Sequence, residues 1–314
     1  MYSFVFPGQG SQFVGMGHDL YKTFPIAREV FQEVNDALNQ NLSKLVFEGT
    51  EADLTLTENA QPALMAVSMA TLKVLEHEYS GSVLKKAALV AGHSLGEYSA
   101  VIAAQGLSLA EGAQVLRLRG KSMQEAVPPG LGGMAALLGV NVEQAEAIVN
   151  ASSNANHEVC SIANDNSPGQ VVVSGHAHAI QKVMEIAKDY GASRAIMLQV
   201  SAPFHSTLME PAALAMRKAL QEVSLKKLSL PLMANVSAQL VQEPEDVRTS
   251  LIDQVTGRVR WRESVDQFKD LNIKRVVELG AGKVLSGLVK RINPDLETFS
   301  LCTPKEIDEF LKRF

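Results

Sequence analysis

The stretch of sequence that decides the fold is Gly92-His93-Ser94-Leu95-Gly96, which has the form G-x-S-x-G. The apolar run 87–91 before it is typical of a strand, and residues 97–105 after it are typical of a helix. A serine on the sharp turn between them is lifted off the sheet at a helix N-terminus, where unpaired N–H groups favour developing negative charge. The flanking glycines allow the turn to be tight. We therefore predict that Ser94 is a nucleophile, with a plain Gly-Ser connection as the alternative.

The composition is that of a globular protein without nucleic-acid or membrane features. The chain has 314 residues, 46% of them apolar and 20% charged, and its net charge is -5. A nucleic-acid binder would normally carry a basic stripe, so we expect no nucleic-acid partner. No signal peptide or membrane-spanning run is evident, and two distant cysteines form no disulfide framework, so we expect a cytoplasmic protein that contacts no membrane. The seven histidines lack metal-ligand spacing, so we expect no metal and no other cofactor.

Strand-like and helix-like segments alternate from the start of the chain, which indicates an α/β fold. The strands predicted for the main sheet are 2–6, 87–91, 231–236 and 275–279. The helices predicted around it are 25–40, 62–79, 97–105, 109–127 and 208–223. We found no internal repeat and no low-complexity segment.

Residues 134–200 have a rhythm of their own. They are predicted in the order strand, helix, strand, strand, helix, strand, at 134–140, 142–151, 159–163, 170–174, 179–190 and 195–200. A turn is predicted at 164–169. The order βαββαβ is the signature of a ferredoxin-like unit, and proline-containing segments mark its entry and its exit. We therefore predict a small domain, residues 129–200, inserted into a larger domain formed by residues 1–128 and 201–314.

A serine hydroxyl is a poor nucleophile until a base takes its proton, and the best candidate for that base is His205. It lies between a predicted strand end and a predicted helix start, where α/β folds build their sites. The sequence Thr207-Leu208-Met209-Glu210 resembles a capping box that opens the helix. A histidine that only packs in the loop is the alternative. His93 adjoins Ser94, but neighbours on a tight turn rarely face each other. We therefore expect His93 to form a wall of the site or to support it.

Six motifs follow one another along nearly the whole chain: Phe6-Pro7-Gly8-Gln9-Gly10-Ser11-Gln12, Gly92-His93-Ser94-Leu95-Gly96-Glu97-Tyr98, Arg119-Gly120-Lys121, Asn166-Ser167-Pro168-Gly169-Gln170, Phe204-His205-Ser206 and Glu278-Leu279-Gly280-Ala281-Gly282-Lys283-Val284-Leu285. In this order they resemble the motifs of malonyl-CoA:acyl-carrier-protein transacylases and of the related acyltransferase domains of polyketide synthases. The chain departs from many of these relatives at Ala281, where they have proline. The resemblance implies an α/β-hydrolase-like large domain with an inserted ferredoxin-like small domain, in agreement with the segmentation above.

The resemblance also implies a role for each matching residue. Ser94 matches the nucleophile that takes the malonyl group from coenzyme A, and His205 matches the general base that later protonates the leaving thiol and activates the incoming one. These relatives have no acidic third residue, and a backbone carbonyl at the position matching Gln254 orients the histidine. The backbone N–H groups of Gln9 and Leu95 match the oxyanion hole, whose donors are worth about 3–4 kcal/mol each.

Two further matches concern the acyl group. Arg119 matches the arginine that pairs with the malonyl carboxylate. The chemistry demands such a group, because an unpaired buried carboxylate is prohibitive and a guanidinium grips it with two parallel hydrogen bonds. By helical spacing Arg119 borders the apolar face of its helix, whereas Arg117 points further from that face. Phe204 matches a phenylalanine that accompanies a preference for malonyl over methylmalonyl groups in the polyketide domains.

The expected function is transfer of a malonyl group from malonyl-CoA to the phosphopantetheine thiol of an acyl carrier protein, through a malonyl-serine intermediate, in fatty-acid biosynthesis. A monomer is expected, because nothing in the sequence demands an oligomer. Three alternatives stay open: a discrete acyltransferase of a polyketide pathway, a serine esterase or thioesterase with Asp165 or Asp189 as its acid, and a non-catalytic subunit that binds a carrier protein. Retention of Ser94, His205 and Arg119 together argues against the last of these.

Overall fold

The apolar run 2–6 forms a central strand of a six-stranded sheet in the computed structural model, which describes residues 1–153, 158–200 and 202–314. The strands of this sheet are β1 (Tyr2–Phe6), β2 (Ala87–Gly92), β7 (Leu232–Met233), β8 (Leu240–Val241), β9 (Arg275–Leu279) and β10 (Glu297–Leu301). Their order is β10-β9-β1-β2-β7-β8. The β7–β8 pair is antiparallel and every other pair is parallel. Parallel neighbours need crossover connections, so helices cover this sheet.

Both faces of the six-stranded sheet are buried, which explains why β1 is apolar and buried at nearly every position. Phe4 and Phe6 belong to the core on one face, and Val5 belongs to the core on the other. The first core includes residues of α5 (Thr57–Tyr79), α6 (Leu95–Ala103) and α7 (Leu109–Glu125). The second includes residues of α12 (Trp261–Asp266) and α13 (Val284–Ile292).

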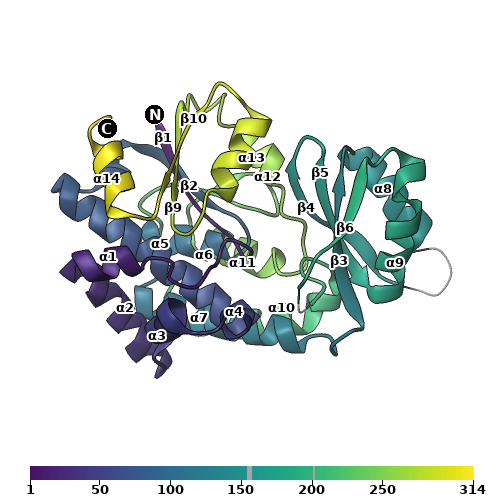
Figure 1. The fold of residues 1–314 in the computed structure, drawn as a ribbon, viewed down its shortest axis with the longest axis horizontal. Coiled ribbons are helices and arrows are strands. Elements are labelled where there is room, and N and C mark those ends of the chain that lie inside the picture. Colours follow the sequence, from purple (N-terminus) through teal and green to yellow (C-terminus); the bar gives the residue numbers. More distant parts are fainter. Residues whose placement is uncertain (154–157, 201) are drawn as a thin grey trace.

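The remaining helices of this part of the molecule lie around these layers (Figure 1). They are α1 (His18–Thr23), α2 (Pro25–Leu38), α3 (Leu42–Glu48), α4 (Glu51–Thr55), α10 (Glu210–Glu222), α11 (Pro244–Asp253) and α14 (Pro304–Leu311), with the short 3-10 helices η1 (Val83–Lys86) and η3 (Thr207–Met209). The two chain ends lie near each other at the top of the view in Figure 1.

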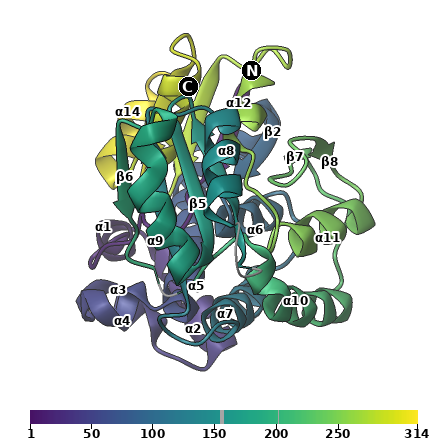
Figure 2. The ribbon, with the colours of Figure 1, turned by 90° about the vertical axis from the view of Figure 1, so that its right-hand side faces the viewer.

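A second sheet has four antiparallel strands in the order β4-β5-β3-β6. Its elements, in chain order, are β3 (Gly132–Leu138), α8 (Val142–Ser152), β4 (Cys160–Ser167), β5 (Gln170–His176), α9 (Ala177–Ile186), η2 (Ala187–Tyr190) and β6 (Arg194–Met197). The helices α8 and α9 cover the face of this sheet that points away from the six-stranded sheet (Figure 1), and a view from that side shows them in front of the strands (Figure 2). The chain therefore follows the predicted order βαββαβ.

The two sheets are joined through β4. The N–H of Asp165 donates to the carbonyl of Val259 at 2.9 Å, and the N–H of Val259 donates to the carbonyl of Ala163 at 2.8 Å. The Asp165 carboxylate is only 1% exposed, and it accepts from Arg262 Nε at 3.0 Å and from Arg262 Nη2 at 2.8 Å. Burial raises the pKa of Asp165, and the Arg262 guanidinium opposes that shift. Two main-chain bonds thus connect the second sheet to the segment before α12, and a bidentate ion pair connects it to α12 itself.

Replacing Arg262 by alanine is expected to lower the free energy of unfolding by about 2–4 kcal/mol, because the Asp165 carboxylate would stay buried without its cation. Urea unfolding at pH 7 measures this loss. Arg260→Ala is the matched control, because Arg260 pairs with Glu263 within one helical turn and both side chains are partly exposed. Its expected loss is below about 1 kcal/mol. Equal losses in the two variants would contradict a special role for the buried pair.

The structure corrects several sequence predictions of local structure. The turn predicted at 164–169 is wrong, since residues 164–167 continue β4 and only Pro168 and Gly169 turn the chain. These polar residues pair with β5 up to Ser167, and main-chain bonds between Val259 and the pair Ala163 and Asp165 add a second partner that the local pattern does not reveal. The strands predicted at 231–236 and 195–200 are shorter than expected, and they end at Met233 and Met197.

Two helix starts also differ from the predictions. The helix predicted from residue 62 begins at Thr57, so Pro62 lies inside it. The capping box predicted at 207–210 does not form, because η3 occupies this segment and α10 begins at Glu210 without a side-chain cap. The predicted domain boundary at Ser201 and residues 154–157 of the predicted small domain lie outside the described residues.

Candidate active site

Ser94 stands on the turn between β2 and α6. Its backbone adopts φ 53° and ψ -113°, a strained conformation for a residue with a side chain. Two glycines close the turn: a Cβ on Gly92 would lie 2.0 Å from the backbone of Gly96, and a Cβ on Gly96 would lie 2.1 Å from the carbonyl oxygen of Phe6. No side chain fits at either position, so the glycines of G-x-S-x-G follow from the close packing of β1, β2 and α6.

The side chain of Asn235 forms hydrogen bonds with the backbone of this turn at two positions. The N–H of Ser94 donates to Asn235 Oδ1 at 2.8 Å, and Asn235 Nδ2 donates to the carbonyl of Gly92 at 2.6 Å. Asn235 is 1% exposed, so both bonds are made in a dry environment. We conclude that Asn235 supports the strained conformation of Ser94. The sequence analysis missed this residue, because its partners lie 141 and 143 positions away.

His205 faces the serine. Its Nε2 lies 2.8 Å from Ser94 Oγ, and its Nδ1 lies 2.7 Å from the carbonyl oxygen of Gln254 and 3.1 Å from that of Gly257. Because both partners of Nδ1 are acceptors, Nδ1 carries the proton and Nε2 is free to accept the serine proton. His205 has a φ of 56°, so it too is held in the left-handed region. Gln254 lies where its expected role requires, and Gly257 adds a second carbonyl that the sequence analysis did not identify.

Burial lowers the pKa of His205 to about 3, and the neighbouring charge of Arg119 acts in the same direction. The imidazole is therefore neutral at physiological pH, which is the form that a general base needs. Burial also lowers the pKa of His93, whose Nε2 lies 2.8 Å from Asn166 Oδ1. His93 thus points from the turn toward β4, in agreement with the expectation that it is a wall of the site.

Arg119 lies beside the serine with its guanidinium fully buried. Its Nη2 donates to Ser94 Oγ at 3.2 Å and to Gln254 Oε1 at 2.7 Å, and its Nη1 donates to Gln61 Oε1 at 2.9 Å. The guanidinium carbon also lies 5.3 Å from the centre of the Tyr98 ring, within range of a cation–π contact. The sequence analysis did not identify Gln61, which comes from α5 and has no local pattern that marks it.

The charge of Arg119 is incompletely neutralised. Burial lowers its pKa, but an arginine keeps its proton in a protein. Within residues 1–153, 158–200 and 202–314, Arg119 forms no direct ion pair, and its Nε has no hydrogen-bond partner. A buried cation with an unused donor next to a serine hydroxyl is suited to hold an anionic group of a substrate.

Comparison with known proteins identifies the family. The model of the acyl transferase domain matches residues 3–291. The chain belongs to this acyl transferase family. It is 44% identical over 306 residues to a malonyl CoA-acyl carrier protein transacylase from Bacillus subtilis, which covers 98% of this chain and 95% of the relative.

Solved structures of the acyl transferase family agree. The acyl-carrier-protein S-malonyltransferase from Bartonella henselae is 49% identical, with a TM-score of 0.96 and coverage of 99% of this chain and 98% of that one. A malonyl-transacylase solved in complex with a type II PKS acyl-carrier protein is 36% identical, with a TM-score of 0.95 and coverage of 100% and 99%. An α/β fold of mixed sheets and helices is therefore shared along the full chain.

Ser94, His205 and Arg119 line a cavity of about 330 Å³ between the two sheets. Gln9 and Phe204 line it with Ser94, as does Met134 of β3. The Gln9 side chain donates to Thr57 Oγ1 at 3.3 Å, which holds the loop after β1 against α5. Leu95 is the first residue of α6, where backbone N–H groups have no intrahelical acceptor. Ser94, His205, Arg119 and Gln254 are joined by hydrogen bonds. Gln9 and Phe204 line the same cavity, and Leu95 follows Ser94 directly in the chain.

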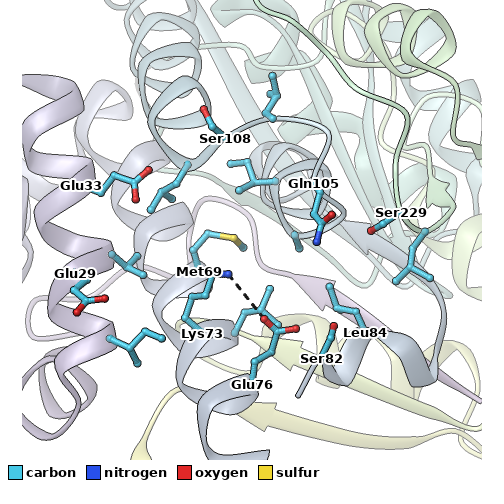
Figure 3. Close-up of a pocket in the computed structure, with 18 of the residues that line it drawn as sticks. Glu29, Glu33, Met69, Lys73, Glu76, Ser82, Leu84, Gln105, Ser108 and Ser229 are labelled. Carbon is cyan, nitrogen blue, oxygen red and sulfur yellow. Dashed lines mark ion pairs between the residues drawn. The ribbon is translucent and has the colours of Figure 1, made fainter. Parts of the chain in front are cut away.

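A larger cavity, of about 700 Å³, lies elsewhere in the acyl transferase, lined by parts of α2, α5 and the start of α7. Figure 3 shows Glu29 and Glu33 on α2 at one side of it, and Lys73 pointing toward Glu76 on α5. None of the residues that line it lines the cavity at Ser94. Choosing a candidate site by cavity volume alone would therefore point to a different place. The strained turn at Ser94 favours the smaller cavity.

The two acidic residues that a hydrolase relay could use do not face His205. Asp165 is engaged by Arg262, and Asp189 lies on η2 beside the four-stranded sheet. Carbonyl oxygens occupy the position of the acid instead. In the described part of the acyl transferase, no group of three or more His, Cys, Asp or Glu side chains could hold a metal ion, and no helix has both the length and the apolar character to cross a membrane.

Proposed function

We propose that this acyltransferase moves a malonyl group from malonyl-CoA to the phosphopantetheine thiol of an acyl carrier protein, in fatty-acid biosynthesis. One observation carries the choice of acyl group: the buried guanidinium of Arg119 lies 3.2 Å from Ser94 Oγ. An acyl group that ends in a carboxylate supplies the negative charge that this cation lacks. The names of the Bacillus subtilis and Bartonella henselae relatives support these substrates, and the solved complex with an acyl-carrier protein supports the partner.

In the first half-reaction, Ser94 Oγ attacks the thioester carbonyl of malonyl-CoA while its proton passes to His205 Nε2, 2.8 Å away. The carbonyl oxygen of the substrate becomes negatively charged, and the N–H groups of Gln9 and Leu95 hold it. The carbon–sulfur bond then breaks, and the coenzyme A sulfur takes the proton from His205. A malonyl ester of Ser94 remains, which makes the reaction ping-pong.

In the second half-reaction, the carrier protein's thiol gives its proton to His205 and attacks the ester carbonyl. The same N–H groups hold the second oxyanion. The bond to Ser94 Oγ breaks, the serine recovers the proton from His205, and malonyl-carrier protein leaves. Water must stay away from the ester until the thiol arrives, and the position of Ser94 in a cavity between the two sheets limits the access of water.

The acyl group is selected at two points. Arg119 pairs with the free carboxylate, and Phe204, which is 8% exposed and lines the cavity, crowds any substituent on the α-carbon. A guanidinium grips a carboxylate with two parallel hydrogen bonds, so the acyl group is oriented as well as selected. We expect the charge to contribute more than the ring, because a methyl group is worth only about 1–3 kcal/mol in a pocket.

Incubation with malonyl-CoA alone, followed by peptide mass spectrometry, tests this proposal. A transferase accumulates a malonyl adduct on the peptide that contains Ser94, and holo-acyl carrier protein then discharges it. Free malonate without an adduct would favour an esterase or thioesterase instead, and absence of any reaction would favour a non-catalytic subunit. Comparing carrier proteins from fatty-acid and type II polyketide synthesis addresses the second candidate, a discrete polyketide acyltransferase, which the solved complex keeps open.

The wider organisation is part of the same proposal. We propose an α/β-hydrolase-like large domain formed by residues 1–128 and 201–314, with a ferredoxin-like small domain at 129–200. The support is that the four-stranded sheet draws all its strands from residues 132–197, whereas the six-stranded sheet draws strands from both flanking parts. We also propose a cytoplasmic monomer that binds neither nucleic acid nor membrane and needs no cofactor, as the sequence suggests.

The pH profile tests the state of His205. A base whose pKa lies near 3 stays neutral down to about pH 4, so kcat/KM for malonyl-CoA should change less than about twofold between pH 7.5 and pH 5. The acid limb of the profile should appear only below that range. Steady-state rates in buffers of constant ionic strength measure this, with unfolding midpoints at each pH as the control. A decline centred near pH 6.5 in a folded enzyme would show that the imidazole is not desolvated as the structure has it.

A further inference from the structure

Glu97 is a buried carboxylate beside the reaction centre that the mechanism above does not use. It lies in the first turn of α6 and is fully buried. Its Oε2 accepts from Gln254 Nε2 at 2.8 Å, and its Oε1 accepts from the N–H of Asn235 at 3.3 Å. Burial raises the pKa of Glu97 to about 8, although these hydrogen bonds and the charge of Arg119 oppose the shift. Burying a carboxyl group at this depth costs free energy. Its presence therefore indicates that a neighbouring group depends on it.

The side chain of Gln254 connects Glu97 to the substrate site. Its Oε1 accepts from Arg119 Nη2 at 2.7 Å, and its Nε2 donates to the carbonyl of Ser94 at 3.0 Å as well as to Glu97. If this amide turned over, its oxygen would face two acceptors and its nitrogen would face the guanidinium donors. Buried groups left unpaired in that way cost about 1–3 kcal/mol each. The amide therefore has one allowed orientation, and Glu97 is one of the two acceptors that enforce it.

We propose that Glu97 is a positioning residue that acts through the Gln254 side chain and sets the selectivity of Arg119 for acyl groups with a free carboxylate. This inference rests on the proposed function, in which Arg119 holds the malonyl carboxylate. The fixed amide oxygen holds one arm of the guanidinium, and Gln61 Oε1 holds the other at 2.9 Å. The planar guanidinium is therefore oriented before the substrate binds, so binding costs less conformational entropy.

The amide of Gln254 also separates the Glu97 carboxyl group from the guanidinium of Arg119. A carboxylate in direct contact with Arg119 would occupy its N–H groups and compete with the substrate. With Gln254 between them, Glu97 and Arg119 make no direct contact. Burial shifts the pKa of each group away from its charged form, and their mutual attraction opposes that shift. The guanidinium keeps its unused Nε, which has no partner within the described residues.

A double variant that exchanges the two side chains, Glu97→Gln with Gln254→Glu, tests the spacer. It keeps one carboxylate and one amide, and the new amide can still donate to the new carboxylate and accept from the N–H of Asn235. The carboxylate now touches Arg119. We expect kcat/KM for malonyl-CoA to fall about 100-fold, mainly through KM, because the new carboxylate competes for the guanidinium. Transfer from acetyl-CoA should fall less, because the loss of the Gln254 donor to the Ser94 carbonyl affects both substrates, whereas competition for the guanidinium affects only malonyl-CoA. The ratio of kcat/KM for the two thioesters is therefore the readout.

The single variant Glu97→Gln tests the positioning itself and covers the case in which the exchange fails to fold. An amide at this position cannot accept from both Gln254 Nε2 and the N–H of Asn235, so the orientation of Gln254 is no longer enforced. We expect the ratio of kcat/KM for malonyl-CoA over acetyl-CoA to fall about 10-fold. If Glu97 only supported the fold, its replacement would lower kcat/KM for both substrates together and leave their ratio unchanged.

The outcomes separate this inference from the proposed function. If the wild-type enzyme does not prefer malonyl-CoA to acetyl-CoA, or if Arg119→Ala keeps that preference, the proposed function fails. If the wild type prefers malonyl-CoA and Arg119→Ala abolishes the preference, the proposed function stands. In that case, a ratio within about twofold of the wild type in every folded variant at position 97 overturns the role of Glu97.

Discussion

Replacing Ser94 by alanine is expected to lower the rate of malonyl transfer by about 10⁴-fold or more, because the covalent route disappears with the hydroxyl. The malonyl adduct should vanish entirely from the corresponding peptide. His205, the oxyanion donors and Arg119 remain, so the variant should still bind malonyl-CoA. Stopped-flow or discontinuous assays of malonyl-carrier protein formation measure the rate, and mass spectrometry of the intact chain measures the adduct.

Ser99→Ala is the matched control for this variant. Ser99 lies on α6, the helix that begins next to Ser94, and its Oγ is buried without a hydrogen-bond partner in the described residues. Removing that hydroxyl should leave the rate within about twofold and should not lower stability, because no bond is broken. If the Ser94 variant kept a tenth of the wild-type rate with holo-carrier protein, direct attack by the carrier thiol would replace the covalent route.

The strain at Ser94 gives this prediction its physical basis. A residue with φ 53° and ψ -113° persists only where its surroundings over-determine it. Here the surroundings are Gly92 and Gly96, which admit no side chain, and Asn235, which ties the two arms of the turn. The fold thus fixes the backbone of Ser94 where its hydroxyl lies 2.8 Å from His205 Nε2. Loss of Asn235 should therefore harm catalysis even though it touches no substrate.

The sequence predicted what depends on local pattern. The apolar run 2–6 is continuous because both faces of a parallel strand are buried, and this is visible without any partner. The turn at Ser94 is visible because only glycine fits on either side of it. The order βαββαβ is visible because each element carries its own periodicity. The contacts behind these features are partly long-range, but the sequence signal of each lies within a few residues.

The residues that the sequence did not reveal depend on long-range contacts. Asn235, Gln61 and Glu97 reach their partners across separations of 143, 58 and 157 residues. No spacing rule marks such a residue. The extended course of β4 was not predicted because its polar residues resemble a turn, whereas they pair with β5 and receive a further partner in Val259. Motif resemblance found Ser94 and His205 but not the side chains that hold them.

Replacing Arg119 by alanine has the second large expected effect. The free enzyme holds a buried cation that a substrate carboxylate would complete, and two charge-assisted hydrogen bonds to it are worth about 3–4 kcal/mol together. We therefore expect kcat/KM for malonyl-CoA to fall about 10²- to 10³-fold. Transfer from acetyl-CoA should be spared or improved, because the alanine variant no longer buries an unneutralised charge beside a neutral acyl group. Parallel assays with the two thioesters measure the change in preference.

Arg117→Ala is the matched control, because Arg117 lies on the same helix but points elsewhere. It donates to Asn59 Oδ1 at 2.9 Å and to Gln40 Oε1, away from Ser94. Its removal should change stability slightly and leave the preference for malonyl-CoA as it is. If Arg119→Ala lowered kcat/KM for both thioesters equally, Arg119 would act on Ser94 or His205 and not on the carboxylate. A selective loss instead makes charge the reason why Ser94 carries a malonyl group and not a shorter, neutral one.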